Sequence, residues 1–255
     1  MPRSSVNTQS NYLDIPAFQH DGFVYRIVKT EHLFKFLRAR ENVLVKPECW
    51  DDPFENFILK SHFIRKGEPV MIAHRDYFYG QCWTLQQASD AMWRIYSPDS
   101  RAVRIRSTIR KLAESLRDWR GEWSSQEAYV GKVRYLKNQD LLAFGRSIHQ
   151  CHKGPLTYKN LAATLLVKRP AFKHEREIRL LFTPHDFHNF TDPIVHYPVE
   201  PNDFVDQVTL DPRMDKADAA ALTKKIADAG FHGPIRRSLL YAPPPDLMIP
   251  WEPNS

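Results

Sequence analysis

The sequence predicts a single α+β domain in which a mixed or antiparallel sheet is flanked by short helices. Short segments rich in β-branched and aromatic residues alternate with segments whose apolar residues recur at helical spacing. Their order is too irregular for repeated strand–helix–strand units, so a doubly wound parallel sheet is disfavoured. Of the 255 residues, 42% are hydrophobic, which is enough for one sizeable core.

The strands are predicted where β-branched and aromatic residues gather between turn residues. In chain order they cover residues 23–28, 42–46, 78–84, 102–106, 129–136, 176–182, 194–197 and 204–210. Pro47 ends the second of them, because proline donates no hydrogen bond to a sheet.

The helices are predicted between these strands from apolar residues that share one face. They begin at Thr30 and after Ser89, and then cover residues 109–119, 141–151, 157–167 and 219–226. Thr30 and Ser89 are typical N-cap residues, and Gly230 is a typical residue just beyond a helix end.

The domain boundaries follow from composition. Residues 1–20 are expected to form a flexible N-terminal arm, residues 21–242 the domain, and residues 243–255 a proline-rich C-terminal tail. The first ten residues are polar, and no apolar run approaches the roughly 18 residues of a membrane span. Three cysteines at unrelated spacings argue against a disulfide framework, so we expect a cytoplasmic protein without a membrane partner.

The net charge of +6 is unevenly distributed. Residues 101–180 contain 18 Lys and Arg against 7 Asp and Glu, whereas residues 181–255 contain 6 against 11. A basic middle region could attract the phosphates of a nucleotide or a nucleic acid. The alternative is a solvated basic face that is balanced by an acidic C-terminal layer.

The strand at 176–182 carries the most informative polar pattern. Because side chains alternate along a strand, one face is predicted to hold Glu175, Glu177 and Arg179. Two carboxylates about 7 Å apart can divide a reaction between them. One orients a nucleophile while the other stabilises developing positive charge, and the neighbouring arginine keeps at least one ionised. The alternative is a solvated face that carries an ion-pair ladder.

A second polar residue stands among apolar neighbours. Arg26 shares its strand face with Val24 and Val28, and a guanidinium there needs an anionic partner. Either it pairs with an internal acid such as Asp52 or it binds an anionic ligand. The turn at residues 51–55 is expected to have the structural role of capping the next helix or anchoring Arg26.

Aromatic residues are dense between residues 81 and 96. Trp83, Trp93 and Tyr96 could stack on a nicotinamide or adenine ring, although core packing explains Trp93 equally well. No metal is expected, since the clusters at residues 149–152 and 185–188 lack the paired spacings of zinc sites. The sequence contains no glycine-rich phosphate loop and no G-x-S-x-G elbow.

Taken in order, these segments resemble the bacterial domain-of-unknown-function family 2971. The likeness covers residues 23–240 and rests on Tyr25-Arg26, the turn at 51–55, Cys82-Trp83-Thr84 with Met92-Trp93 and Tyr96, residues 172–179, and Val208–Pro212. Asp51 stands where that family usually has Asn. The resemblance implies a bacterial protein and supplies no established activity.

A more distant resemblance is to ADP-ribosyltransferases of the Arg–Ser–Glu type. These place an Arg on the first strand, a Ser or Thr on a middle strand and an E-x-E pair on a later one, and Arg26, Thr84, Glu175 and Glu177 stand in that order. The resemblance implies NAD as a co-substrate, held at its pyrophosphate or ribose by Arg26. Glu177 would stabilise the ribosyl cation, Glu175 would orient the acceptor, and Thr84 would brace the site.

The same resemblance implies that Trp83 or Tyr96 packs on nicotinamide and that Arg179 belongs to the ligand-binding set. Cys82-Trp83-Thr84 stands where the pattern has Ser-Thr-Ser. Three interpretations therefore stay open. The chain is an NAD-consuming enzyme, for example of a defence or toxin system; a nucleic-acid-binding protein or nuclease that uses residues 101–180; or a non-catalytic binding module. The oligomeric state is left open.

Overall fold

A ten-stranded mixed sheet forms the centre of the computed structural model, which describes residues 11–50, 52, 54–65, 67–70, 75–150, 157–244 and 248. Its strands are β1 (Tyr12–Leu13), β2 (Phe23–Lys29), β3 (Glu41–Val45), β6 (Tyr79–Thr84), β7 (Ala102–Thr108), β8 (Ala128–Lys132), β11 (Glu177–Phe182), β12 (Ile194–Pro198), β13 (Gln207–Leu210) and β14 (Ile235–Arg237). They follow the order β1-β8-β11-β6-β2-β7-β13-β14, and β3 with β12 branches from β6. Only the β1–β8 and β13–β14 pairs of the described residues are parallel within this sheet.

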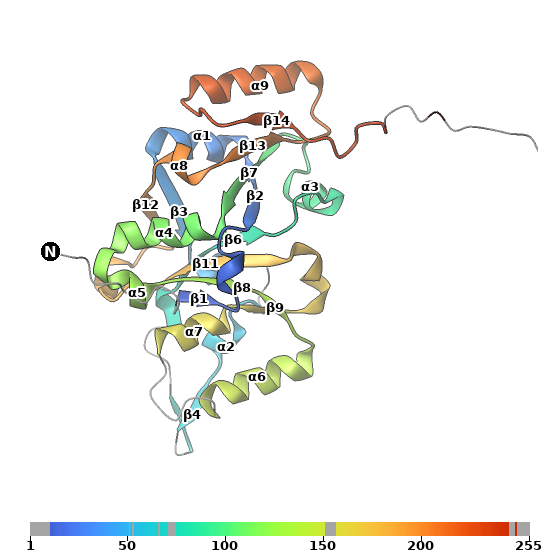
Figure 1. Ribbon diagram of the computed structural model, residues 1–255. Coiled ribbons are helices and arrows are strands. Elements are labelled where there is room, and N and C mark those ends of the chain that lie inside the picture. Colours follow the sequence, from blue (N-terminus) through green and yellow to red (C-terminus); the bar gives the residue numbers. More distant parts are fainter. Residues whose placement is uncertain are drawn as a thin grey trace, which may run out of the picture.

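Short helices and two small strand pairs complete the described chain (Figure 1). The helices are α1 (Thr30–Ala39), α2 (Phe57–Lys60), α3 (Asp90–Tyr96), α4 (Ile109–Arg120), α5 (Ser124–Glu127), α6 (Asn138–Gln150), α7 (Tyr158–Thr164), α8 (Pro201–Phe204) and α9 (Lys216–Asp228). The small pairs are β4 (Phe63–Arg65) with β5 (Glu68–Val70), and β9 (Arg134–Tyr135) with β10 (Val167–Lys168). The predicted class, a single α+β domain with a mixed sheet and flanking helices, is confirmed.

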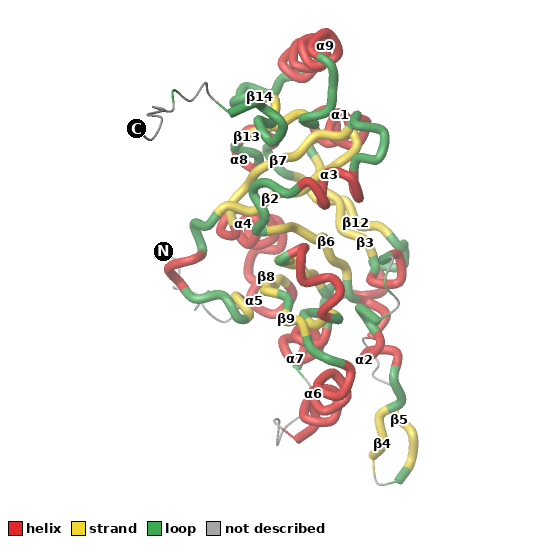
Figure 2. Tube along the Cα trace, turned by 90° about the vertical axis from the view of Figure 1, so that its right-hand side faces the viewer, coloured by secondary structure: helices red, strands yellow, loops and turns green. Residues whose placement is uncertain are grey.

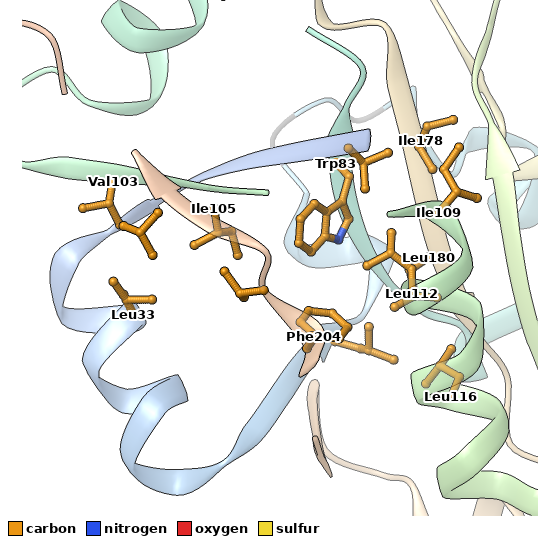
Figure 3. Close-up of a cluster of buried hydrophobic side chains, with 14 of the residues drawn as sticks. Leu33, Trp83, Val103, Ile105, Ile109, Leu112, Leu116, Ile178, Leu180 and Phe204 are labelled. Atoms are coloured by element: carbon orange, nitrogen blue, oxygen red, sulfur yellow. The ribbon is translucent and has the colours of Figure 1, made fainter. Parts of the chain in front are cut away.

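The sheet separates two layers of apolar side chains. The main core lies on one face and contains side chains of α1, α4, α8 and α9, with Trp83 and Phe204 in edge contact (Figure 3). A second cluster lies on the other face, where Tyr129 and Leu181 pack against α2 and α7. As Figure 2 shows, α9 and α6 lie at opposite ends of the molecule. None of the described helices is both long enough and apolar enough to span a membrane.

Most predicted elements occur where the patterns placed them, and Ser89 caps α3 as expected by accepting a hydrogen bond from the Met92 amide. Gly230 follows α9 with a φ of 92°, a left-handed conformation that glycine adopts without strain. Thr30 is not the cap of α1. It is the first helical residue, and its hydroxyl donates to the backbone carbonyl of Arg101 instead.

Three predicted elements were too long, two of them because the chain changes its pairing partner within the predicted range. The strand predicted at 129–136 breaks at the buried Val133, so that β8 and β9 join different sheets. The helix predicted at 157–167 ends at Thr164, and the chain then pairs with β9. The strand predicted from Phe204 begins at Gln207, because Pro201 starts the short helix α8.

The N-terminal arm predicted for residues 1–20 is packed over its described half. Residues 12–13 pair with β8, and Leu13, Ile15 and His20 are buried. Residues 1–10 and most of the predicted C-terminal tail lie outside the described residues.

Candidate functional site

A cavity of about 400 Å³ opens where the sheet branches. Among the described residues, β2 pairs with β6 only at Tyr25 and Thr84, and β3 pairs with β6 only at Val45 and Gly80. Between these two contacts, this edge of β6 has no strand partner among the described residues. Residues of β2 and β3 line the cavity there. The polar lining residues are Arg26, Asp52, Glu55, Gln81, Cys82, Thr84, Tyr96, Lys168, Glu175 and Glu177. The branch therefore brings the early arginine and the downstream acidic pair to one cavity.

Lys168 holds three carboxylates together beside this cavity. Its Nζ lies 2.7 Å from Glu55 Oε1, 2.6 Å from Glu175 Oε2 and 3.5 Å from Glu177 Oε2. All four side chains are less than 10% exposed. Such a cluster is stable only because each buried charge has a partner.

Arg179 is the second cation of this ion cluster, and it is fully buried. Its Nε lies 2.9 Å from Glu177 Oε1 and one terminal nitrogen 3.0 Å from Glu177 Oε2, which is a bidentate pair. The same terminal nitrogen lies 3.2 Å from Glu55 Oε2, and the other donates to the carbonyl of Leu165 at 2.6 Å. The Trp50 ring covers the guanidinium at 4.4 Å. Arg179 thus fixes the direction of the Glu177 carboxylate, rather than pointing to a ligand.

The cluster divides the protonation states of its carboxylates. Burial alone would raise the pKa of Glu177, but Arg179 and Lys168 outweigh it and lower that pKa below its ordinary value. Burial raises the pKa of Glu55, and Arg179 offsets this only in part. Burial would lower the pKa of Lys168, but the surrounding glutamates raise it. Glu177 is therefore the anion of the site, and Glu55 is more easily protonated.

Glu175 does not lie on the strand, contrary to the alternation predicted for residues 175–179. It ends a 3₁₀ helix at Pro170–Glu175, and Arg176 follows in a left-handed conformation with a φ of 44° before β11 begins. The carboxylate nevertheless reaches Lys168, and Tyr96 donates to its other oxygen at 3.1 Å. Burial raises the pKa of Tyr96, so its hydroxyl stays a donor.

Thr84 supports this turn from the opposite strand. Its hydroxyl donates to the backbone carbonyl of Glu175 and accepts from the Gln86 amide at 2.9 Å. Thr84 also stands directly opposite Glu177 in the β6–β11 register. Thr84 thus supports the turn at Glu175, and the bracing role that the resemblance implies for it stays a prediction.

Arg26 has no ion pair or side-chain hydrogen bond within the described part of the chain. Asp52, the internal acid expected as its alternative partner, instead accepts from Arg169 and from the Phe54 amide, each at 3.0 Å. Burial lowers the pKa of Arg26, because its charge is partly removed from water without an anion beside it. An anionic ligand in the cavity would supply that anion.

The aromatic residues differ in their access to the cavity. Trp83 borders it, but its indole is 2% exposed, donates to Gln81 Oε1 at 2.7 Å and packs in the core (Figure 3). Of the two aromatic residues that the resemblance offered for stacking on nicotinamide, Trp83 is thus buried and Tyr96 is the accessible one. Tyr96, Trp50 and Phe172 also line the cavity, and Tyr96 is 42% exposed.

Among the lining residues that were not predicted as site residues are Glu55, Lys168 and Trp50. Glu55 was given a structural role in its turn, and Lys168 follows an apolar run that predicted only a helix. A lysine at the end of an apolar segment is the one signal that could have indicated a buried ion pair.

Several basic residues of the middle region are paired with acids in the described part of the chain. Lys168 and Arg179 belong to the ion cluster, Arg120 pairs with Glu127 at 2.6 Å, and Lys111 pairs with Asp206 at 2.5 Å. No group of three or more metal-ligating side chains occurs in the described residues. Residues 151–152 of the first histidine cluster lie outside the described residues.

The comparisons with known proteins give a remote structural likeness. No protein-family model matches the chain, so the resemblance to domain-of-unknown-function family 2971 is not confirmed, and no curated protein matches it. Solved structures of DarT from Thermus sp. 2.9 align with a TM-score of 0.38 and 9% identity. The complex with carba-NAD+ covers 88% of this chain and 96% of that one, the complex with ADP-ribosylated ssDNA 86% and 94%, and the complex with NAD+ 86% and 96%. At this TM-score the likeness assigns no function.

Proposed function

We propose that the chain is an NAD-consuming enzyme that breaks the bond between nicotinamide and ribose and transfers ADP-ribose to an acceptor or to water. One observation carries the proposal: a single cavity is lined by Arg26, whose guanidinium has no anionic partner among the described residues, and by Glu177, whose pKa is lowered. NAD has the complementary charges, since its pyrophosphate is anionic and its pyridinium ring is cationic.

The side chains that line the cavity favour one orientation of bound NAD. Arg26 binds the pyrophosphate, because guanidinium and phosphate form strong charge-assisted hydrogen bonds. The nicotinamide end then lies toward the ion cluster, where Tyr96 or Trp50 packs on the ring. The formal excess of one negative charge in the cluster, three carboxylates against two cations, favours the cationic ring at this end.

The chemistry requires little covalent participation by the protein. The C1′–N1 bond breaks, its electron pair goes to the pyridinium nitrogen, and neutral nicotinamide leaves. Glu177 stabilises the positive charge that develops on the ribose, and Arg179 holds that carboxylate in a fixed direction. An acceptor hydroxyl or water then attacks C1′ and gives its proton to the Glu175 carboxylate, which Lys168 and Tyr96 orient.

Nicotinamide release, followed by chromatography, tests the proposal. We expect release from the full chain and a loss of about 100-fold or more in Glu177→Gln, the size of effect that charge stabilisation in an active site produces. Glu127→Gln is the matched control, because Glu127 is also fully buried and paired with an arginine but does not line the cavity. Equal activity of the two variants, or no release from the wild-type chain at any NAD concentration, contradicts the proposal.

A second candidate function is a non-catalytic nucleotide-binding module. The observation in its favour is that Glu55, Glu175 and Glu177 all have cationic partners already, as in a structural ion network. Such a module would be stabilised against heat by NAD without releasing nicotinamide. The combined thermal and chromatographic measurements separate the two functions.

A further inference from the structure

Two arginines outside the cavity have no acidic partner in the described residues. Arg104 and Arg106 are two residues apart on β7 and therefore point to the same face of the sheet. Arg104 is only 9% exposed, and the Nε atoms of both side chains are buried without a hydrogen-bond acceptor. The one side-chain contact of Arg104 to an oxygen in this part of the chain is a long one, 3.4 Å from a terminal nitrogen to the hydroxyl of Thr209.

Their neighbours across the sheet are uncharged: one is aromatic, one is aliphatic and two are neutral polar. In the register, Arg106 stands between Tyr25 and Gln207, and Arg104 stands between Ile27 and Thr209. No carboxylate occupies these positions. We call this surface the β7 arginine face, formed by Phe23, Tyr25, Arg104, Arg106, Gln207 and Thr209.

Aromatic rings take the place of acidic partners on the β7 arginine face. The guanidinium of Arg106 lies 4.2 Å from the ring of Phe23, and that of Arg104 lies 4.9 Å from the ring of Tyr25. Phe23 is 47% exposed, so part of this side chain remains accessible to solvent. Cation–π contacts stabilise the two guanidinium groups only in part, because they do not neutralise the charge.

An anion at this face would relieve an unfavourable arrangement. Burial lowers the pKa of Arg104, and the neighbouring charge of Arg106 adds to that effect. Two like charges about 7 Å apart, with no acid between them, produce a local positive potential that attracts phosphate. Arg236, which is exposed and stands next to Thr209 in the register, adds a third positive charge at the edge.

We infer that the β7 arginine face binds single-stranded nucleic acid, with backbone phosphates on Arg104 and Arg106 and a base stacked on Phe23. Unpaired arginines beside an open aromatic ring are the combination that binds single strands, because the guanidinium groups follow the backbone and the ring stacks on any base. A site for an isolated phosphate would not need the aromatic ring of Phe23. Tyr25 belongs both to this face and to the cavity lining, so a strand bound here passes beside the cavity.

Fluorescence anisotropy with labelled 20-mers of single-stranded DNA, single-stranded RNA and duplex DNA tests the inference on the full chain. At about 50 mM salt we expect binding of a single-stranded probe and weaker binding of the duplex, with a steep loss as salt increases. Arg106→Gln should weaken binding about 10-fold and reduce the salt slope by about 1, as expected for one lost phosphate contact. Phe23→Ala should weaken binding about 10-fold at unchanged salt slope, since stacking is not ionic.

The control is Arg117→Gln, which removes one positive charge from α4, where Arg117 contacts Glu114 and Asp118. This variant should bind like the wild-type chain. No anisotropy change with either single strand, equal binding of duplex, or equal effects of Arg106→Gln and Arg117→Gln would each overturn the inference. Full competition by a few millimolar inorganic phosphate would also do so, since it would indicate a small-anion site. No NAD is used, so the outcome of this experiment does not depend on whether the chain cleaves NAD.

Discussion

Replacing Arg26 by methionine separates binding from stability, because Arg26 has no partner within the described residues. Methionine has a similar length and no charge, so Arg26→Met removes a buried unpaired group and retains most of the packing. Leaving a buried polar group unsatisfied costs about 1–3 kcal/mol, and Arg26 keeps some access to the cavity, so we expect a gain of about 1–2 kcal/mol. In a domain of this size such a gain raises the midpoint of thermal unfolding by about 2–8 °C.

Thermal unfolding of both chains, each with and without NAD, measures the two effects together. NAD at about 100 times its dissociation constant should stabilise the wild-type chain by about 2.7 kcal/mol and leave Arg26→Met unchanged. The variant should thus be more stable alone and less stable than the wild-type chain in the presence of NAD. A loss of more than 1 kcal/mol in the variant without ligand would show that the guanidinium has a structural partner and would refute the reasoning.

Three further predictions concern the ion cluster and its support. Glu177→Gln should destabilise the chain by about 2–3 kcal/mol at pH 7, because it leaves a buried cation short of one charged acceptor. Thermal unfolding measures this, and an unchanged midpoint would contradict it. The folded-state pKa of Glu177 is lowered, so its stabilising contribution is present above the ordinary value of 4.5 and is lost as the pH falls through the lowered value. The folded-state pKa of Glu55 is raised, so its contribution is present below 4.5 and is lost as the pH rises through the raised value. Glu55→Gln should therefore be less destabilising than Glu177→Gln at pH 7. The difference between their free energies of unfolding, measured from unfolding curves, should shrink toward pH 4, and a difference that grows toward pH 4 would contradict the two pKa directions. Gly80→Ala should cost about 1–3 kcal/mol, because its Cβ would lie 2.7 Å from the Trp50 ring and 3.1 Å from Leu181; urea unfolding with tryptophan fluorescence measures this, and an unchanged urea midpoint would show that the ring moves freely.

Local residue patterns were sufficient to predict most strands of the sheet. Residues 23–28 and 102–106 formed strands close to prediction because their β-branched residues, such as Val24, Val103 and Ile105, pack in the main core. The predicted boundaries were wrong where pairing with a segment distant in sequence determines where an element ends. Val133 interrupts an extended segment because the following residues pair with β10, which follows it by more than 30 positions in the chain.

The cavity was predictable only in part for the same reason. Arg26 was singled out because a charge among apolar neighbours needs an anion wherever the chain folds. The choice between Asp52 and a ligand depended on Arg169, which pairs with that acid across 117 positions of sequence. Trp83 shows the limit of reasoning from residue type, because the register that directs its ring into the core is set by β11.

The position of Glu175 shows how two predicted residues can lie together although the predicted local geometry is wrong. Two acids separated by one residue were expected to project together from a strand, yet Arg176 turns the chain with a φ of 44° between them. Their carboxylates meet because Lys168 lies within 2.6 Å of one and 3.5 Å of the other. The turn leaves Glu177 on the sheet with Arg179, where its charge is fixed, and places Glu175 beside Tyr96, whose ring is partly exposed. The proposed reaction needs one carboxylate to stabilise a cation and another to activate an acceptor, and the departure from regular strand geometry gives the two acids the different neighbours that such separate roles require.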